Sequence, residues 1–182
     1  MSGLPASGKS TLGREIAKAL RLPMLDKDEM LEALFESQGI GDTDWRRRLS
    51  RLADDGLIGE ATNLTAAVVT SWWHHPESGE ASGTPIEWLS SLQGEIIEIY
   101  CACSPPIAAS RFLGRTRHAG HIDSQYAYSS LLASFQAQSA LGPLRVGRTV
   151  EVNTETWPCV SRLLAELGIN PSENPSNASP AP

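Results

Sequence analysis

The sequence predicts an α/β fold in which a parallel β-sheet is covered by helices on both faces. Apolar segments of strand length alternate with amphipathic helical segments along the chain, which is typical of parallel sheets. A strand segment such as 66–70 is a continuous apolar run, as in strands buried on both faces. A glycine-rich loop near the N-terminus leads directly into a helix. The length of 182 residues fits one domain.

The glycine-rich loop fits the phosphate-binding pattern G-x-x-x-x-G-K-[ST] at every specified position. It consists of Gly3, Leu4, Pro5, Ala6, Ser7, Gly8, Lys9 and Ser10, and Thr11 follows. Glycines let backbone N–H groups point at phosphate oxygens, and the following helix adds its positive N-terminal end. In this pattern Lys9 reaches the β- and γ-phosphates and the Ser10 hydroxyl is a ligand of Mg²⁺. The loop therefore predicts nucleotide binding.

A buried strand normally precedes a loop of this kind and holds it at the edge of the sheet. Here the sequence begins at Met1, two residues before Gly3. We therefore expect the first strand of the fold to be missing from this chain.

The composition excludes several classes of protein. A net charge of −6, from 21 acidic and 15 basic residues, argues against a general nucleic-acid binder. No apolar run approaches the ~20 residues of a membrane span, and no signal peptide is visible. Cys101, Cys103 and Cys159 lack metal-ligand spacing, so we expect reduced, mostly buried thiols of a cytoplasmic protein.

Two carboxylates follow the second predicted strand, 22–25. Asp26 and Asp28 would lie on the same side of an extended chain, at the end of a strand where ligands collect in open α/β sheets. A local explanation is helix capping, since Asp26 has capping-box spacing with Glu29 and Asp28 could cap a helix over 29–37. Capping needs one carboxylate, so the pair favours a functional site.

The next predicted helix has Thr43 or Asp44 as its cap. One side of it is crowded with arginines, namely Arg46, Arg47, Arg48 and Arg51. A solvated face explains such a cluster most simply, and contact with an anionic acceptor is the alternative.

The third predicted strand, 66–70, ends in Thr70-Ser71-Trp72-Trp73 without a carboxylate. In P-loop proteins this strand often ends in an aspartate that supports Mg²⁺, so its absence disfavours a simple ATPase. Trp72, Trp73, His74 and His75 predict either core packing or an aromatic wall for a substrate.

The C-terminal half continues the alternation of helices and strands. We expect a short helix over 85–92, a strand over 95–101 and a helix from Ser104. The next helix would be capped by Asp123 or Ser124 and would turn Tyr128, Leu132 and Phe135 inward. A strand over 148–152 and a helix ending at Gly168 come next, and residues 170–182 form a Pro/Ser/Asn-rich tail expected to be disordered.

Three arginines lie in and after the helix from Ser104. Arg111 and Arg115 are four residues apart and would share a helix face, and Arg117 follows. His118 and His121 are poor zinc candidates because no other ligands are near in sequence.

This layout resembles the small P-loop kinases. Within them it is most similar to the predicted kinases grouped with chloramphenicol phosphotransferase, zeta-toxin-type kinases and polynucleotide 5′-kinase. The resemblance rests on the loop, on Asp26-Lys27-Asp28 and on the segment from Arg111 to His118, and it extends to about Gly168. Leu31 stands where polynucleotide kinases have an arginine, which disfavours a nucleic-acid 5′-end as acceptor.

The resemblance implies a phosphotransferase that uses ATP and Mg²⁺. Asp28 would take the proton from an acceptor hydroxyl, and Arg115, with Arg111 or Arg117, would close over the phosphates. Ser10 would ligate Mg²⁺ and Asp26 would hold it through water. The kinase domain would span 1–169, with a lid at about 111–123.

Two further hypotheses remain open at this point. A non-catalytic or regulatory ATP-binding module would explain the missing strand and the missing strand-end carboxylate. A nucleic-acid-coupled ATPase is disfavoured by the acidic charge. The sequence does not identify the acceptor, and a sugar, an antibiotic, a nucleoside or a metabolite alcohol would fit.

Overall fold

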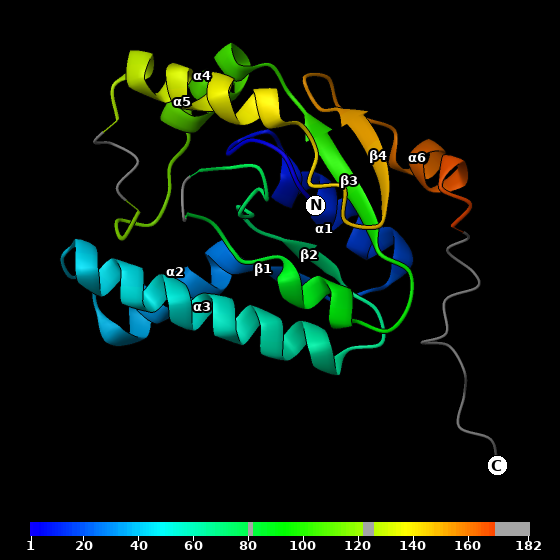
Figure 1. Ribbon diagram of the computed structural model, residues 1–182, viewed down its shortest axis with the longest axis horizontal. Coiled ribbons are helices and arrows are strands. Elements are labelled where there is room, and N and C mark those ends of the chain that lie inside the picture. The colour runs from blue at the N-terminus through cyan, green and yellow to red at the C-terminus, as the bar shows by residue number, and fades with distance from the viewer. Residues whose placement is uncertain (80–81, 122–125, 170–182) are drawn as a thin grey trace.

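Parallel strands lie in the middle of the molecule and helices surround them in the computed structural model, which describes residues 1–79, 82–121 and 126–169 (Figure 1). The strands are β1 (Met24–Asp26), β2 (Val68–Thr70), β3 (Ile97–Ala102) and β4 (Arg148–Asn153). The helices are α1 (Lys9–Leu20), α2 (Lys27–Gln38), α3 (Thr43–Asn63), α4 (Pro105–Gly114), α5 (Tyr128–Leu141) and α6 (Val160–Glu166), with a 3₁₀ helix η1 (Glu87–Ser91). The predicted α/β fold is confirmed.

The strands form two parallel pairs, β1 with β2 and β3 with β4. Met1 and Ser2 lie between the pairs and connect them. The Met1 amino group donates a hydrogen bond of 2.7 Å to the Val69 carbonyl. The N–H of Ser2 donates to the Ile99 carbonyl at 3.0 Å, and the Ser2 carbonyl accepts from the Cys101 N–H at 2.9 Å. The described residues form no strand ahead of the loop, so these two residues stand where a central strand would pair with both neighbours.

Helices cover both faces of the strands. Leu12 and Ile16 of α1 and Leu164 of α6 pack with Val68, Ile99 and Val152 of the strands on one face. Leu57 and Ala61 of α3 pack with Leu25 of β1 on the other. Helices α4 and α5 pack together around Leu4, Phe112 and Phe135. The continuous apolar strand runs are therefore explained by burial on two sides.

Several predicted helix boundaries are wrong in detail. Helix α2 begins at Lys27 and its cap is Asp26, which accepts from the Asp28 N–H, so Asp28 lies in the first turn and is not the cap. Asp42 caps α3, in place of Thr43 or Asp44.

Helix α5 turns a different face inward than predicted. It buries Leu131 and Phe135, whereas Leu132 is half-buried and Tyr128 is exposed. The proposed caps Asp123 and Ser124, and the tail 170–182, lie outside the described residues.

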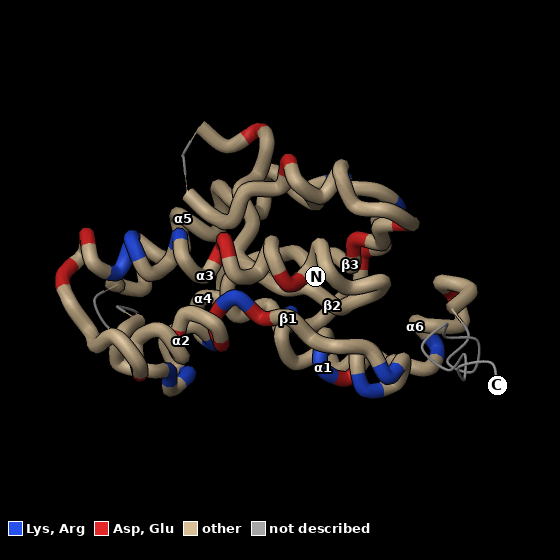
Figure 2. The backbone as a smooth tube through the Cα atoms, turned by 90° about the horizontal axis from the view of Figure 1, so that it is seen from below, with Lys and Arg blue, Asp and Glu red and all other residues tan. Residues whose placement is uncertain are grey.

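Figure 2 shows basic and acidic residues spread along the backbone among a majority of uncharged ones, with several basic residues along α1 at the lower edge of the view. In the described part of the chain, no helix is both long enough and apolar enough to cross a membrane. Cys101 and Cys103 are buried, Cys159 is exposed, and all three are free thiols.

Candidate active site

The phosphate-binding loop has a backbone that glycine makes possible. Gly3 and Gly8 have φ angles of 120° and 96°, in the region that favours glycine. A Cβ atom at Gly3 would lie 2.6 Å from the Cys101 carbonyl oxygen, so a side chain there would push the loop off β3. Ala6 also has a positive φ, of 60°. The loop then turns into α1 at Lys9, which leaves the first N–H groups of the helix available for phosphate.

Lys9 folds back across this loop. Its Nζ donates hydrogen bonds to the Gly3 carbonyl at 3.0 Å and the Leu4 carbonyl at 2.8 Å. The side chain is buried, and burial lowers the pKa of Lys9 to about 8. The ammonium group is therefore held by two neutral carbonyls of the loop.

Ser10 and Asp26 meet at the start of α1 and the end of β1. Asp26 is buried, and burial raises its pKa against the opposing effect of a hydrogen bond from the Ser10 hydroxyl. Arg14 approaches the same carboxylate at 3.7 Å. Among the described residues, no group of three His, Cys, Asp or Glu side chains could hold a metal ion. A hydroxyl next to one carboxylate nevertheless fits Mg²⁺, which in such sites binds one or two protein oxygens together with phosphate and water.

Asp28 lies two residues after Asp26, in the first turn of α2. Its side chain is 54% exposed, and its Oδ2 is 2.6 Å from Nη2 of Arg117. Burial of part of the carboxylate acts to raise the pKa of Asp28, but Arg117 and then His121 outweigh it and lower the pKa. Asp28 is therefore ionised at neutral pH and able to accept a proton from a hydroxyl.

The predicted lid arginines separate in the structure. Helix α4 ends at Gly114, so Arg115 is outside it, and the prediction that Arg111 and Arg115 share a helix face is wrong. The Arg115 guanidinium lies 4.4 Å from the centre of the Phe112 ring, and its charge contributes to the lowered pKa of Lys9. Arg111 instead donates to the carbonyls of Thr154 and Glu155, both at 3.0 Å, in the segment after β4.

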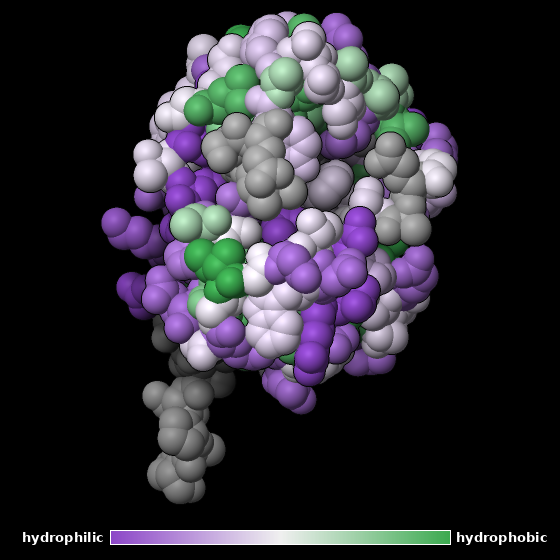
Figure 3. Space-filling model, turned by 90° about the vertical axis from the view of Figure 1, so that its left-hand side faces the viewer, coloured by the Kyte–Doolittle hydropathy of each residue, from purple (hydrophilic) through white to green (hydrophobic). Residues whose placement is uncertain are grey.

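The segment 115–121 is fastened to α2. Nε2 of His118 is 3.0 Å from Glu36, and Nε2 of His121 is 2.9 Å from Glu32. The Phe35 ring lies between them, stacked on His118 and edge-on to His121. We call this group of five side chains the α2 clasp. Figure 3 looks onto this side of the molecule, where the surface is hollowed between its upper and lower halves.

Comparison with known proteins places this site in a family. The model of the AAA domain family matches residues 1–125, which include the loop, both aspartates and the three arginines. The chain belongs to this family. No curated protein matches the chain.

Several solved structures share the fold of this chain. A "putative kinase" from Chloroflexus aurantiacus J-10-fl has a TM-score of 0.73 and 23% identity, covering 92% of this chain and 95% of that one. Shikimate kinase from Bacteroides thetaiotaomicron gives 0.58 at 17% identity, over 92% and 96% of the two chains. Shikimate kinase from Acinetobacter baumannii, in complex with shikimate, gives 0.54 at 20% identity, over 91% and 87%. The resemblance to small P-loop kinases is thus confirmed at the level of fold, and the narrower kinase groups named above stay predictions.

Sequence reasoning missed the acidic partners of the clasp. Asp28, Glu32, Phe35 and Glu36 recur at helical spacing and so share one face of α2. This periodicity was the available signal, but it does not reveal what the face contacts. On the arginine-rich side of α3, Arg47 pairs with Asp44 at 3.1 Å and Arg48 lies over Trp45, both within the same helix. The predicted lid includes residues 122–123, which lie outside the described residues.

Proposed function

We propose that the protein transfers the γ-phosphoryl group of ATP to a hydroxyl group of a small-molecule acceptor. The observation that carries this proposal is that the start of α1, which holds Lys9, and the start of α2, which holds Asp28, meet at Asp26. The Asp26 carboxylate accepts hydrogen bonds from the Ser10 hydroxyl and from the Asp28 N–H. Lys9 neutralises phosphate and Asp28 accepts a proton, and phosphoryl transfer to an alcohol needs both at one place. Kinases with the same fold, one of them in complex with the small molecule shikimate, support the assignment.

In the proposed reaction, the loop N–H groups and Lys9 bind the β- and γ-phosphates of ATP. Lys9 exchanges the carbonyls of Gly3 and Leu4 for phosphate oxygens. Arg115 and Arg117 would add positive charge beside the negative charge that develops on the transferred phosphoryl group. Asp28 orients the acceptor hydroxyl in line and takes its proton. Ser10 directly and Asp26 through water would hold Mg²⁺, which supplies charge neutralisation between the phosphates when bound.

The proposed function also implies domain bounds, a role for Arg111, a location and a partner. We assign the kinase domain to residues 1–169 and Arg111 to the nucleotide side of the site, since its guanidinium holds the segment after β4. A cytoplasmic location fits the three free cysteines. A small hydroxyl compound is the expected partner, and the net charge of −6 argues against a nucleic-acid partner.

Two variants test the division of labour at this site. Lys9→Ala should weaken ATP binding and lower turnover together, because its charge is used in both. Asp28→Asn should leave ATP affinity and the melting temperature nearly unchanged and lower acceptor-dependent ADP formation by ~10²–10⁴. Asp44→Asn is the matched control, because Asp44 is 88% exposed on α3 and pairs only with Arg47 among the ion pairs described. Near-full activity of Asp28→Asn would move the base to another residue.

A regulatory ATP-binding module is the second candidate. The observation in its favour is the end of β2, where Thr70, Ser71 and Trp72 stand in place of a carboxylate, and the Ser71 hydroxyl is bound to Thr84. For this candidate, ATP should bind with Lys9 dependence while no hydroxyl compound stimulates ADP release. Stimulated release by any acceptor excludes it.

A further inference from the structure

A small cavity opens beside the first turn of the phosphate-binding loop. Its walls come from the loop start, from the segment after β2, from β3 and from the C-terminal end of α5, and its volume is about 70 Å³. The lining includes Gly3 and Leu4 from the loop, Trp72 after β2, Tyr100 of β3 and Gln138 of α5. None of the described lining residues is Lys, Arg, Asp or Glu. The cavity is therefore polar through hydroxyl, amide and imidazole groups and carries aromatic surface.

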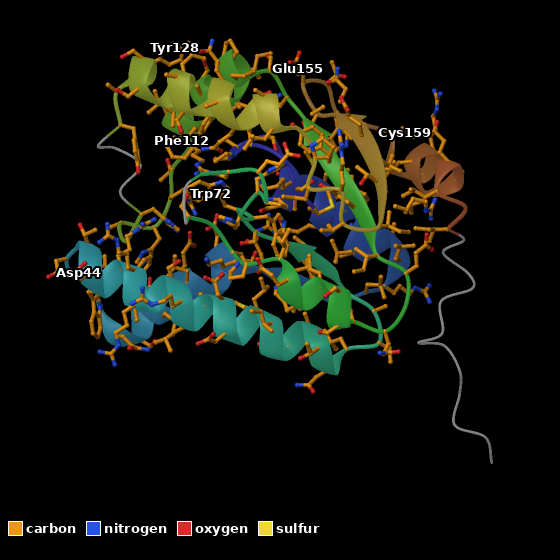
Figure 4. The ribbon with its side chains drawn as sticks, in the orientation of Figure 1. Asp44, Trp72, Phe112, Tyr128, Glu155 and Cys159 are labelled. Atoms are coloured by element: carbon orange, nitrogen blue, oxygen red, sulfur yellow. The ribbon has the colours of Figure 1, made fainter. Side chains whose placement is uncertain are left out.

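The cavity lies next to the proposed chemistry. Gly3 and Leu4 form part of its wall, and their carbonyls hold the Lys9 ammonium group at 3.0 and 2.8 Å. Trp72 is 46% exposed and lies in the space between the layer of α4 and α5 and the layer of α2 and α3 (Figure 4). A molecule with one end in this cavity would thus reach the phosphate site with its other end.

A buried carboxylate stands directly behind the wall. Glu98 is 3% exposed, and it accepts hydrogen bonds from the Ser2 hydroxyl at 2.6 Å and the Leu144 N–H at 2.8 Å. Ser2 and Leu144 both line the cavity. Glu98 therefore fixes two wall residues and places negative charge beneath them. Burial raises the pKa of Tyr100 on the same strand, so its phenol remains a neutral hydrogen-bond donor.

An anionic group would be unstable in this cavity. A carboxylate or phosphate that leaves water needs a cation or several hydrogen-bond donors. The described lining offers no Lys or Arg side chain, and the Glu98 carboxylate lies behind it. A hydroxyl-bearing carbon frame would instead place its apolar side on tryptophan and its hydroxyls on the polar lining groups.

We propose that this cavity receives an uncharged, hydroxyl-bearing end of the phosphoryl acceptor and selects against acceptors that carry a carboxylate or phosphate there. The inference rests on the proposed phosphotransferase function and narrows its substrate class to neutral polyhydroxy compounds. A cavity of about 70 Å³ would admit one edge of the acceptor, and the rest of the molecule would lie over Trp72.

Matched pairs of acceptors that differ by one anionic group test the inference. ADP release is measured for glycerol against glycerate, glucitol against gluconate, and uridine against uridine 5′-monophosphate, with shikimate as a further anion. We expect kcat/KM to be at least about tenfold higher for the neutral member of every productive pair, and no stimulation by shikimate. A preference for anionic members overturns the inference and leaves the phosphotransferase function in place. Tight ATP binding without stimulation by any compound overturns the proposed function itself.

A charge placed in the wall gives a second test. Gln138 is half-buried and lines the cavity, whereas Gln136 is exposed on the same helix. Gln138→Arg should shift the preference at least about tenfold toward the anionic member of each pair, and Gln136→Arg should not. The melting temperature of both variants and their ATP affinity separate this effect from misfolding. Equal behaviour of the two variants would show that the cavity does not contact the acceptor.

Discussion

At the scale of single residues, the site depends on charges that are held in unusual surroundings. Lys9 is buried among carbonyls, Asp26 is buried beside a hydroxyl, and Asp28 is half-exposed beside Arg117. The loop pattern and the Asp-x-Asp turn predict site roles for all three residues, and these roles stay predictions. The sequence did not assign their protonation behaviour, because burial depends on which helices pack over each carboxylate.

The lowered pKa of Lys9 predicts how ATP binding depends on pH. Phosphate binds the charged ammonium, and burial lowers the pKa of Lys9 to about 8 in the protein without nucleotide. Affinity should therefore be constant below pH 7 and fall by about tenfold between pH 7 and 9. Calorimetry at pH 8 in buffers of different ionisation enthalpy should show proton uptake on binding. Lys9→Arg should remove this pH dependence, since arginine stays charged throughout the range. Flat affinity in the unaltered protein would contradict the assignment.

At the scale of elements, prediction succeeded where the signal is local and failed where two distant segments meet. The helices and strands were placed within a few residues because apolar periodicity and glycine mark them. The predicted helix included Arg115, whereas α4 ends at Gly114, so Arg115 does not share a helix face with Arg111. The α2 clasp was not predicted, because nothing in the sequence near His118 or His121 points to Glu36 or Glu32, which lie 82 and 89 residues away.

Gly120, which packs against Phe35 of the α2 clasp, gives a prediction for segment 115–121. A Cβ atom at Gly120 would lie 2.3 Å from the Phe35 ring, whereas one at Gly114 would meet no atom within 4 Å. Gly120→Ala should loosen segment 115–121 from α2 and destabilise the protein by about 1–3 kcal/mol. Faster hydrogen exchange of this segment and a lower melting temperature are the measurements. Gly114→Ala is the matched control and should be neutral or slightly stabilising, because alanine is the better helix former.

At the scale of the whole molecule, the fold requires that the β1–β2 pair and the β3–β4 pair be connected to each other. Met1 and Ser2 bridge β2 and β3 through backbone hydrogen bonds. Side chains reinforce the second pair, where Glu98 of β3 lies opposite Thr149 of β4. The α/β class was predictable from the alternation of strands and helices. The connection of the two pairs by Met1 and Ser2 was not predictable, because two residues are too few to show a hydrophobic periodicity.

Substitution of Glu98 tests whether the contacts between Ser2, β3 and β4 depend on one buried carboxylate. It accepts from the Ser2 hydroxyl, the N–H groups of Leu144 and Arg145, and the Thr149 hydroxyl, at distances between 2.6 and 2.9 Å. Glu98→Ala would leave four donors without their acceptor at a buried position, and each such donor costs about 1–3 kcal/mol unless water replaces the carboxylate.

We therefore expect Glu98→Ala to lower the free energy of unfolding by about 3–5 kcal/mol. Denaturant titration measures this value. The matched control is Glu95→Ala, just before β3, where Glu95 is 62% exposed and pairs with Arg148. An exposed pair contributes about 0–1 kcal/mol, so the control should stay close to the unaltered protein. Because Glu98 holds Ser2 next to Gly3, ATP affinity should fall with stability in Glu98→Ala and not in Glu95→Ala. Similar stability of the two variants would show that β3, β4 and the loop are held together by backbone pairing and apolar packing alone.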